Sequence, residues 1–116
     1  MTQQIVKNKL SGSTDGKGIL VQTTSTTIHT SIAGTTAGDF DEIWIFACNR
    51  NTSNENLIIE WGATDGTQDI KLALTPNSGG WVVIPGDVLR NGMVVTAKAD
   101  TNDKVLITGY VNEIRH

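Results

Sequence analysis

The sequence predicts an all-β protein, folded as a single-domain antiparallel β-sandwich of the jelly-roll kind, and three observations predict it. The chain of 116 residues holds sixteen Thr and twelve Gly but only two Pro. Thr, Val and Ile favour strands, whereas Gly, Asn and Asp favour the turns between them. Short apolar runs separated by turn residues recur about every 8–12 residues, which is the spacing of a sandwich. No stretch keeps the 3.6-residue period of an amphipathic helix, and the length suits one domain.

About eight strands are expected after residue 17. They cover residues 18–23, 27–33, 41–49, 57–62, 69–74, 81–84, 93–99 and 105–114. The first two are expected to pair, with residues 34–39 as the next loop. Turn signals such as Asp65-Gly66 and Asn91-Gly92 separate later runs. The sequence "PGD" at 85–87 is expected to end the strand 81–84. Two sheets of four strands, packed about 10 Å apart, would bury the inward residues.

Residues 1–17 differ from the rest of the chain and predict a flexible N-terminal arm in front of a sandwich domain at 18–116. The arm offers three apolar anchors, Ile5, Val6 and Leu10, followed by the turn-forming run "SGSTDGKG". A terminus with so few apolar groups is expected to be loose in the isolated monomer. Lys7, Lys9 and Lys17, against Asp15, give it a mild positive charge.

The strand "DEIWIFACN" raises the main functional question, because it is apolar on both sides. Ile43 and Ile45 point one way along an extended chain, and Trp44 and Phe46 point the other way. Leaving a Trp and a Phe in water would expose roughly 300 Å² of apolar surface, or about 7 kcal/mol of unrealised burial. That is comparable with the whole stability of a small domain, about 5–15 kcal/mol.

The second side of this strand is therefore expected to be covered, either by the arm or by another subunit. The arm has few apolar groups, so a subunit is favoured and a homo-oligomer is predicted. Which side of the strand meets the partner cannot be read from the sequence, so both sides enter the predicted interface, together with a neighbouring run such as "WVVI" or "MVV". The predicted interface residues are Ile43, Trp44, Ile45, Phe46, Trp81 and Val83.

Residues for catalysis or metal binding are sparse, and the sequence predicts neither an enzyme nor a cofactor. His29 and His116 are the two histidines, and His29 is expected to be a surface or hydrogen-bonded strand residue. Most carboxylates are expected in turns, while Glu60 and Glu113 lie on strands with no evident partner. No CxxC, HxH or HExxH spacing occurs. Cys48 is expected to be a small buried hydrophobe.

Charge and hydropathy exclude two further classes of function. The net charge of −3 comes from scattered single charges, so no nucleic-acid footprint is present. No apolar run approaches the roughly 20 residues of a membrane span. The first eighteen residues lack a secretory apolar segment, and a chain made and kept in a reducing cytosol is expected.

Carbohydrate binding is the rival reading of the aromatic residues. Trp44, Trp61, Trp81 and Tyr110 could form a stacking platform on one face of a sandwich. Burial is favoured over this reading, because large aromatics mostly serve cores and interfaces and Trp61 alternates with Leu57 and Ile59.

Several segments together resemble a group of small structural proteins of tailed-phage virions. They are "LSGSTDGKGILV", "TTIHT", "DEIWIFACN", "LIIEWG", "VVIPGDVLRNGMVVTAKA" and "VLITGYVNEI", which span the chain from about Leu10 to Ile114. The resemblance implies a virion protein, and some similar proteins are capsid cement or decoration proteins that form β-sandwich trimers on the head. It implies no catalytic residues.

The resemblance also implies partners and a location. The expected partners are further copies of the chain, as a homotrimer, and the major capsid protein. The expected location is the capsid surface, after synthesis in the host cytoplasm. The arm is the expected capsid contact, although its lysines could equally serve only to solubilise it. A tail or neck position stays open, because no sequence feature separates it from the head. The predicted capsid-contact residues are Ile5, Val6, Lys7, Lys9 and Leu10.

Overall fold

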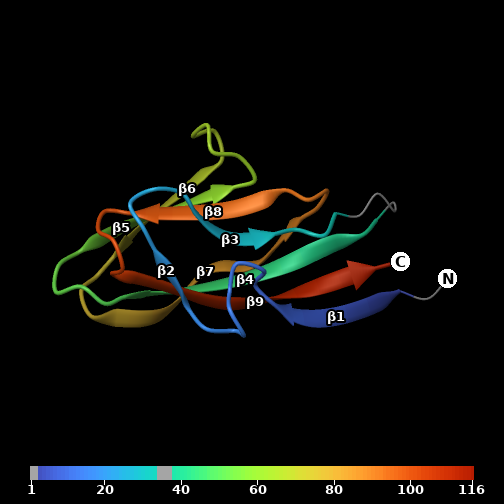
Figure 1. The fold of residues 1–116 in the computed structure, drawn as a ribbon, viewed down its shortest axis with the longest axis horizontal. Coiled ribbons are helices and arrows are strands. Elements are labelled where there is room, and N and C mark those ends of the chain that lie inside the picture. Colours follow the sequence, from blue (N-terminus) through green and yellow to red (C-terminus); the bar gives the residue numbers. More distant parts are fainter. Residues whose placement is uncertain (1–2, 34–37) are drawn as a thin grey trace.

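Two antiparallel sheets pack face to face in this protein, and the computed structural model describes residues 3–33 and 38–116 (Figure 1). The described part contains nine strands, and no helix in it is long and apolar enough to cross a membrane. The predicted all-β sandwich is confirmed. The strands are β1 (Gln4–Lys9), β2 (Ile19–Val21), β3 (Thr26–Thr30), β4 (Phe40–Asn49), β5 (Glu55–Trp61), β6 (Asp69–Leu74), β7 (Ser78–Leu89), β8 (Val94–Ala99) and β9 (Val105–Arg115).

The strands are distributed between the sheets in the interleaved manner of a jelly roll. The five-stranded sheet has the order β1-β9-β4-β7, with β2 also beside β9, and the four-stranded sheet has the order β3-β8-β5-β6. Strands from both ends of the chain therefore lie side by side, as in the two Greek keys of a jelly roll. β2 to β9 make up the expected eight-stranded sandwich, and β1 is an additional ninth strand.

Two local expectations are wrong, and a third falls largely on residues that the structure does not describe. The expected pairing of residues 18–23 with 27–33 does not occur, because β2 pairs with β9 and β3 pairs with β8 in the other sheet. The "PGD" run does not end a strand, since β7 continues through it by means of register shifts against β4. These bulges absorb the missing N–H of Pro85 at an edge strand, where proline is tolerated. The predicted loop 34–39 lies largely outside the described residues.

The N-terminal segment is also not the loose arm that the sequence predicts. β1 pairs with β9 over six residues, from Gln4 opposite Arg115 to Lys9 opposite Tyr110. Residues 10–18 then leave the five-stranded sheet and reach β3 of the other sheet, where Gly12 N donates to Ile28 O at 2.9 Å. This excursion closes one side of the sandwich. Backbone pairing, which needs no apolar side chains, is what orders the segment.

The core lies between the sheets and is aliphatic. Ile43 and Ile45 of β4 are fully buried there, in one cluster with Leu57 and Ile59 of β5. A chain of this size can bury enough apolar surface to fold without metal or disulfide staples. Partly buried residues extend the core at its margins, and these are Trp61, Ile70, Leu72 and Leu89.

A buried polar contact links the two sheets. His29 of β3 lies 2.7 Å from Asp41 of β4, through Nε2 and Oδ2, and both side chains are buried. Ser11 N donates to Nδ1 of the same imidazole at 2.9 Å, so Nδ1 is an acceptor and the proton lies on Nε2. His29 is thus the hydrogen-bonded residue that the sequence allowed, but Asp41 lies on a buried strand and not in a turn.

Glu60 differs from the prediction as well, because it has partners. Its Oε1 accepts hydrogen bonds from Ser25 Oγ at 2.6 Å and Thr96 Oγ1 at 2.8 Å. Lys98 Nζ lies 4.0 Å from the other carboxylate oxygen. These contacts satisfy a nearly fully buried carboxylate, as its burial requires.

Candidate interaction face

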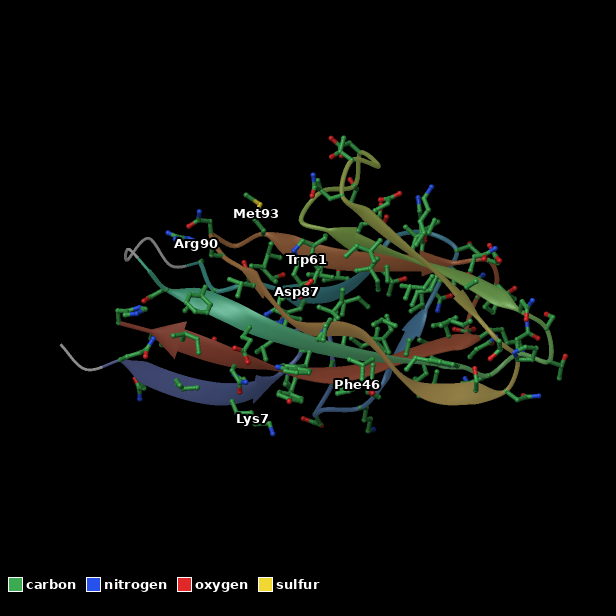
Figure 2. All side chains as sticks on the ribbon, turned by 180° about the vertical axis from the view of Figure 1, so that it is seen from behind. Lys7, Phe46, Trp61, Asp87, Arg90 and Met93 are labelled. Carbon is green, nitrogen blue, oxygen red and sulfur yellow. The ribbon has the colours of Figure 1, made fainter. Side chains whose placement is uncertain are left out.

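The side of the five-stranded sheet that points away from the four-stranded sheet is here named the outer face. Trp44 and Phe46 of β4 point to it, on the opposite side from the buried Ile43 and Ile45, and Figure 2 shows Phe46 there. Cross-strand pairing places further apolar residues beside them, since Val82 is opposite Phe46 and Tyr110 is opposite Trp44. The outer face includes Leu20, Glu42, Trp44, Phe46, Val82, Val88, Leu106 and Tyr110.

The aromatic residues of the outer face shield one another within a single chain. The rings of Trp44 and Tyr110 are stacked, with centroids 6.1 Å apart and planes 12° from parallel. The Phe46 ring lies 6.4 Å from that of Tyr110. Lys7 of β1 places its ammonium 4.3 Å from the Tyr110 ring centroid, a cation–π distance. Trp44 and Phe46 are consequently half-buried and leave less apolar surface in water than the sequence estimate assumed.

Two neighbours fix the position of the Trp44 ring. Its Nε1 donates to Glu42 Oε1 at 3.2 Å, and Asn112 Nδ2 donates to the same oxygen at 3.0 Å. Gly86 of β7 has a φ of +85°, and a Cβ there would lie 3.0 Å from Trp44 Cζ2. Glycine therefore serves two purposes at this position, since it adopts the left-handed backbone and lets the indole lie against β7.

The predicted interface residues separate into two groups. Ile43, Ile45 and Val83 are buried inside the chain and cannot meet a partner, so these three predictions are wrong. The reason is strand alternation, which turns one side of β4 inward. Trp44 and Phe46 lie half-buried on the outer face, and Trp81 is 47% exposed.

Two residues that are not in the list of predicted interface residues carry more of the exposed apolar surface. Val82 and Val88 of β7 are 53% and 51% exposed. Their positions on the outer face depend on the irregular register of β7 against β4. Simple alternation of side chains places Val82 on the opposite side of β7 from Trp81. It does not predict the side on which Val88 lies, because the bulges between the two residues interrupt the alternation.

Trp81 lies at a second surface, here named the open side, where the edges of the two sheets face each other. In the described part of the chain, β6 pairs with β5 alone and β7 with β4 alone. A cavity of about 180 Å³ lies between the two edges. Trp81 Nε1 donates to Ser78 Oγ at 2.9 Å, which holds the indole beside the cavity. The cavity is lined by Leu72, Ala73, Leu74, Thr75, Trp81, Val82 and Val83.

The predicted capsid-contact residues are mostly accessible. Ile5 is 64% exposed, and Lys7 and Lys9 are also exposed on β1, while Val6 is half-buried. Leu10 is the exception, because it packs in the core between the sheets. Its prediction as a contact residue is wrong, since the turn after β1 carries it inward.

The four aromatics proposed as a glycan platform do not come together on one surface. Trp44 and Tyr110 stack on the outer face, Trp61 packs against the core, and Trp81 lies at the open side. Cys48 is half-buried on β4 and not fully buried as expected. Among residues 3–33 and 38–116, no cluster of three or more His, Cys, Asp or Glu side chains is arranged to hold a metal ion.

Comparison of the chain with protein-family models, with curated proteins and with solved structures found no match.

Proposed function

We propose that this protein is a structural protein of a tailed-phage virion, and specifically a homotrimeric cement or decoration protein on the capsid. The observation that carries the self-association is the apolar outer face, with Val82 and Val88 about half exposed beside the aromatic stack. The sequence resemblance to small virion proteins supplies the virion setting. The jelly-roll topology is compatible with this role, but it also occurs in lectin domains, so the fold alone does not decide between functions.

The size of the outer face suits a specific protein interface. β4 spans ten residues, or about 34 Å, and four strands side by side cover about 19 Å. The resulting area of about 650 Å² per copy approaches the roughly 800 Å² per partner of a standard specific interface. Sedimentation equilibrium tests the association directly. A mass of three times the 12.4 kDa chain at micromolar concentration supports the proposal, and a monomer contradicts it.

The capsid contact is assigned to β1, where Ile5, Lys7 and Lys9 are exposed at the end of the outer face farthest from β7, with Lys7 over the Tyr110 ring. The two lysines favour an acidic partner surface on the major capsid protein. Their replacement by glutamate should abolish binding to undecorated heads in a co-sedimentation assay. The matched control replaces two other lysines, Lys71 of β6 and Lys104 in the loop before β9. Equal loss of binding in both variants would mean that overall charge, and not β1, governs attachment. If the protein binds tails and not heads, its inferred location in the virion is the tail or neck.

Glycan binding is the alternative function that the Trp44–Tyr110 stack favours, since flat aromatic surfaces stack on sugar rings. The two functions differ in their effect on tryptophan fluorescence. A structural protein should show no change with added oligosaccharide, whereas a glycan-binding module should show a saturable shift that Trp44→Ala removes.

A further inference from the structure

The proposed trimer needs two different contact surfaces on each copy. This requirement makes it possible to infer which surface of the next copy the outer face contacts. A flat face that packs on its own copy produces a two-fold dimer. A ring of three copies instead requires a heterologous contact, in which one patch of each copy meets another patch of the next. The outer face is one such patch. The open side is a second patch, to which the proposed function alone assigns no role.

The two patches meet along β7. Val82 of β7 is opposite Phe46 of the outer face and also lines the cavity of the open side, whereas Trp81 is opposite the inward-pointing Ala47 and lies beside that cavity. Exposed apolar surface therefore continues around the edge of the sandwich, from Val82 to Trp81. Copies placed around an axis that runs along β7 would bring the outer face of one copy against the open side of the next.

Three features favour another copy of this chain over an added peptide strand as the occupant. Residues 72–86, which include the open side and Val82, hold no charged side chain, so this half of the contact can meet an identical copy without repulsion between like charges. Pro85 and the register shifts of β7 hinder strand addition at this edge, so the occupant contributes side chains. The cavity of about 180 Å³ is large enough for one bulky apolar side chain, because a cavity of about 150 Å³ already holds benzene.

We propose that the chain assembles through a heterologous contact in which the open side around Trp81 of one copy receives the outer face around Val82 and Val88 of the next. The proposal deepens the proposed function and rests on its self-association. It assigns Trp81 to one half of the contact and Val88 to the other.

Lysine substitutions test this assignment, with oligomer mass as the readout. Trp81→Lys alters the open side and Val88→Lys alters the outer face, where Glu42 is its cross-strand neighbour. Met93→Lys is the matched control, because Met93 is exposed to the same 47% as Trp81 and belongs to neither patch. Trp81→Lys and Val88→Lys should each be monomeric, and Met93→Lys should keep the wild-type mass. Far-UV circular dichroism and melting temperature confirm that each variant is folded.

Mixing the two monomeric variants then distinguishes the kinds of contact. Trp81→Lys keeps an unaltered outer face, and Val88→Lys keeps an unaltered open side. If the contact is heterologous, these two unaltered surfaces bind each other in the mixture and give a particle of twice the chain mass. A contact between two identical faces leaves the mixture monomeric and overturns the proposal. If the wild type is an oligomer and Trp81→Lys does not change its mass, this proposal fails while the proposed function stands. If the wild type is a monomer, the self-association itself fails.

Discussion

Removing the carboxylate of Asp41 should destabilise the fold strongly, because it joins the two sheets at a buried position. Its Oδ2 accepts hydrogen bonds from His29 Nε2 at 2.7 Å and from Ile32 N at 3.0 Å. Asp41→Ala leaves both donors without an acceptor. Each unsatisfied buried donor costs about 1–3 kcal/mol, so the loss of two partners should lower the free energy of unfolding by about 2–6 kcal/mol. Such a loss is a large part of the roughly 5–15 kcal/mol available to a domain of this size.

Urea denaturation, followed by tryptophan fluorescence, measures this loss as a shift of the midpoint at unchanged slope. Asp41→Asn is the control, because the amide oxygen can still accept both hydrogen bonds. Its cost should be about half that of alanine, since its NH₂ replaces Oδ1, for which the described residues offer no partner. Nitrogen-15 NMR should find the His29 proton on Nε2. A loss below about 1 kcal/mol for Asp41→Ala, or a proton on Nδ1, would refute this account of the contact.

Three further predictions concern other parts of the fold. Ile45→Ala should lower the free energy of unfolding by about 2–5 kcal/mol in the same urea assay, because it empties a fully buried core position; a cost near zero would contradict its placement. Gly12→Ala should speed amide exchange in residues 10–18, since a Cβ there would lie 2.6 Å from Ile28 O, and unchanged exchange would speak against the excursion. Asp65 has a pKa below its ordinary 3.8 because the Thr67 hydroxyl and amide hydrogen-bond to its carboxylate. The resulting loop stabilisation is present above about pH 3.8 and is lost as the pH falls through the lowered pKa, and Thr67→Val should raise the NMR-measured pKa.

The candidate interaction surfaces were only partly predictable. Two-sided apolarity in "DEIWIFACN" identified β4 as a strand with a second apolar side, and Trp44 and Phe46 do lie on that side. Which of the two sides of β4 faces the core depends on the neighbouring strands. The prediction therefore included Ile43 and Ile45 in the interface, although both are buried. The cavity beside Trp81 joins residues of two different sheets, and no local pattern in the sequence reports such a meeting.

The sequence by itself determined the fold class and most of the strands, because strand and turn preferences and the alternation of side chains are local properties of the chain. It also marked β4 as apolar on both sides. Tertiary structure alone decided that β2 and β3 belong to different sheets and that residues 4–9 form a strand beside β9. It also decided that His29 meets Asp41 across the sandwich. These features depend on hydrogen bonds and packing between residues far apart in the chain, and the energy of such contacts exists only once the sheets have assembled.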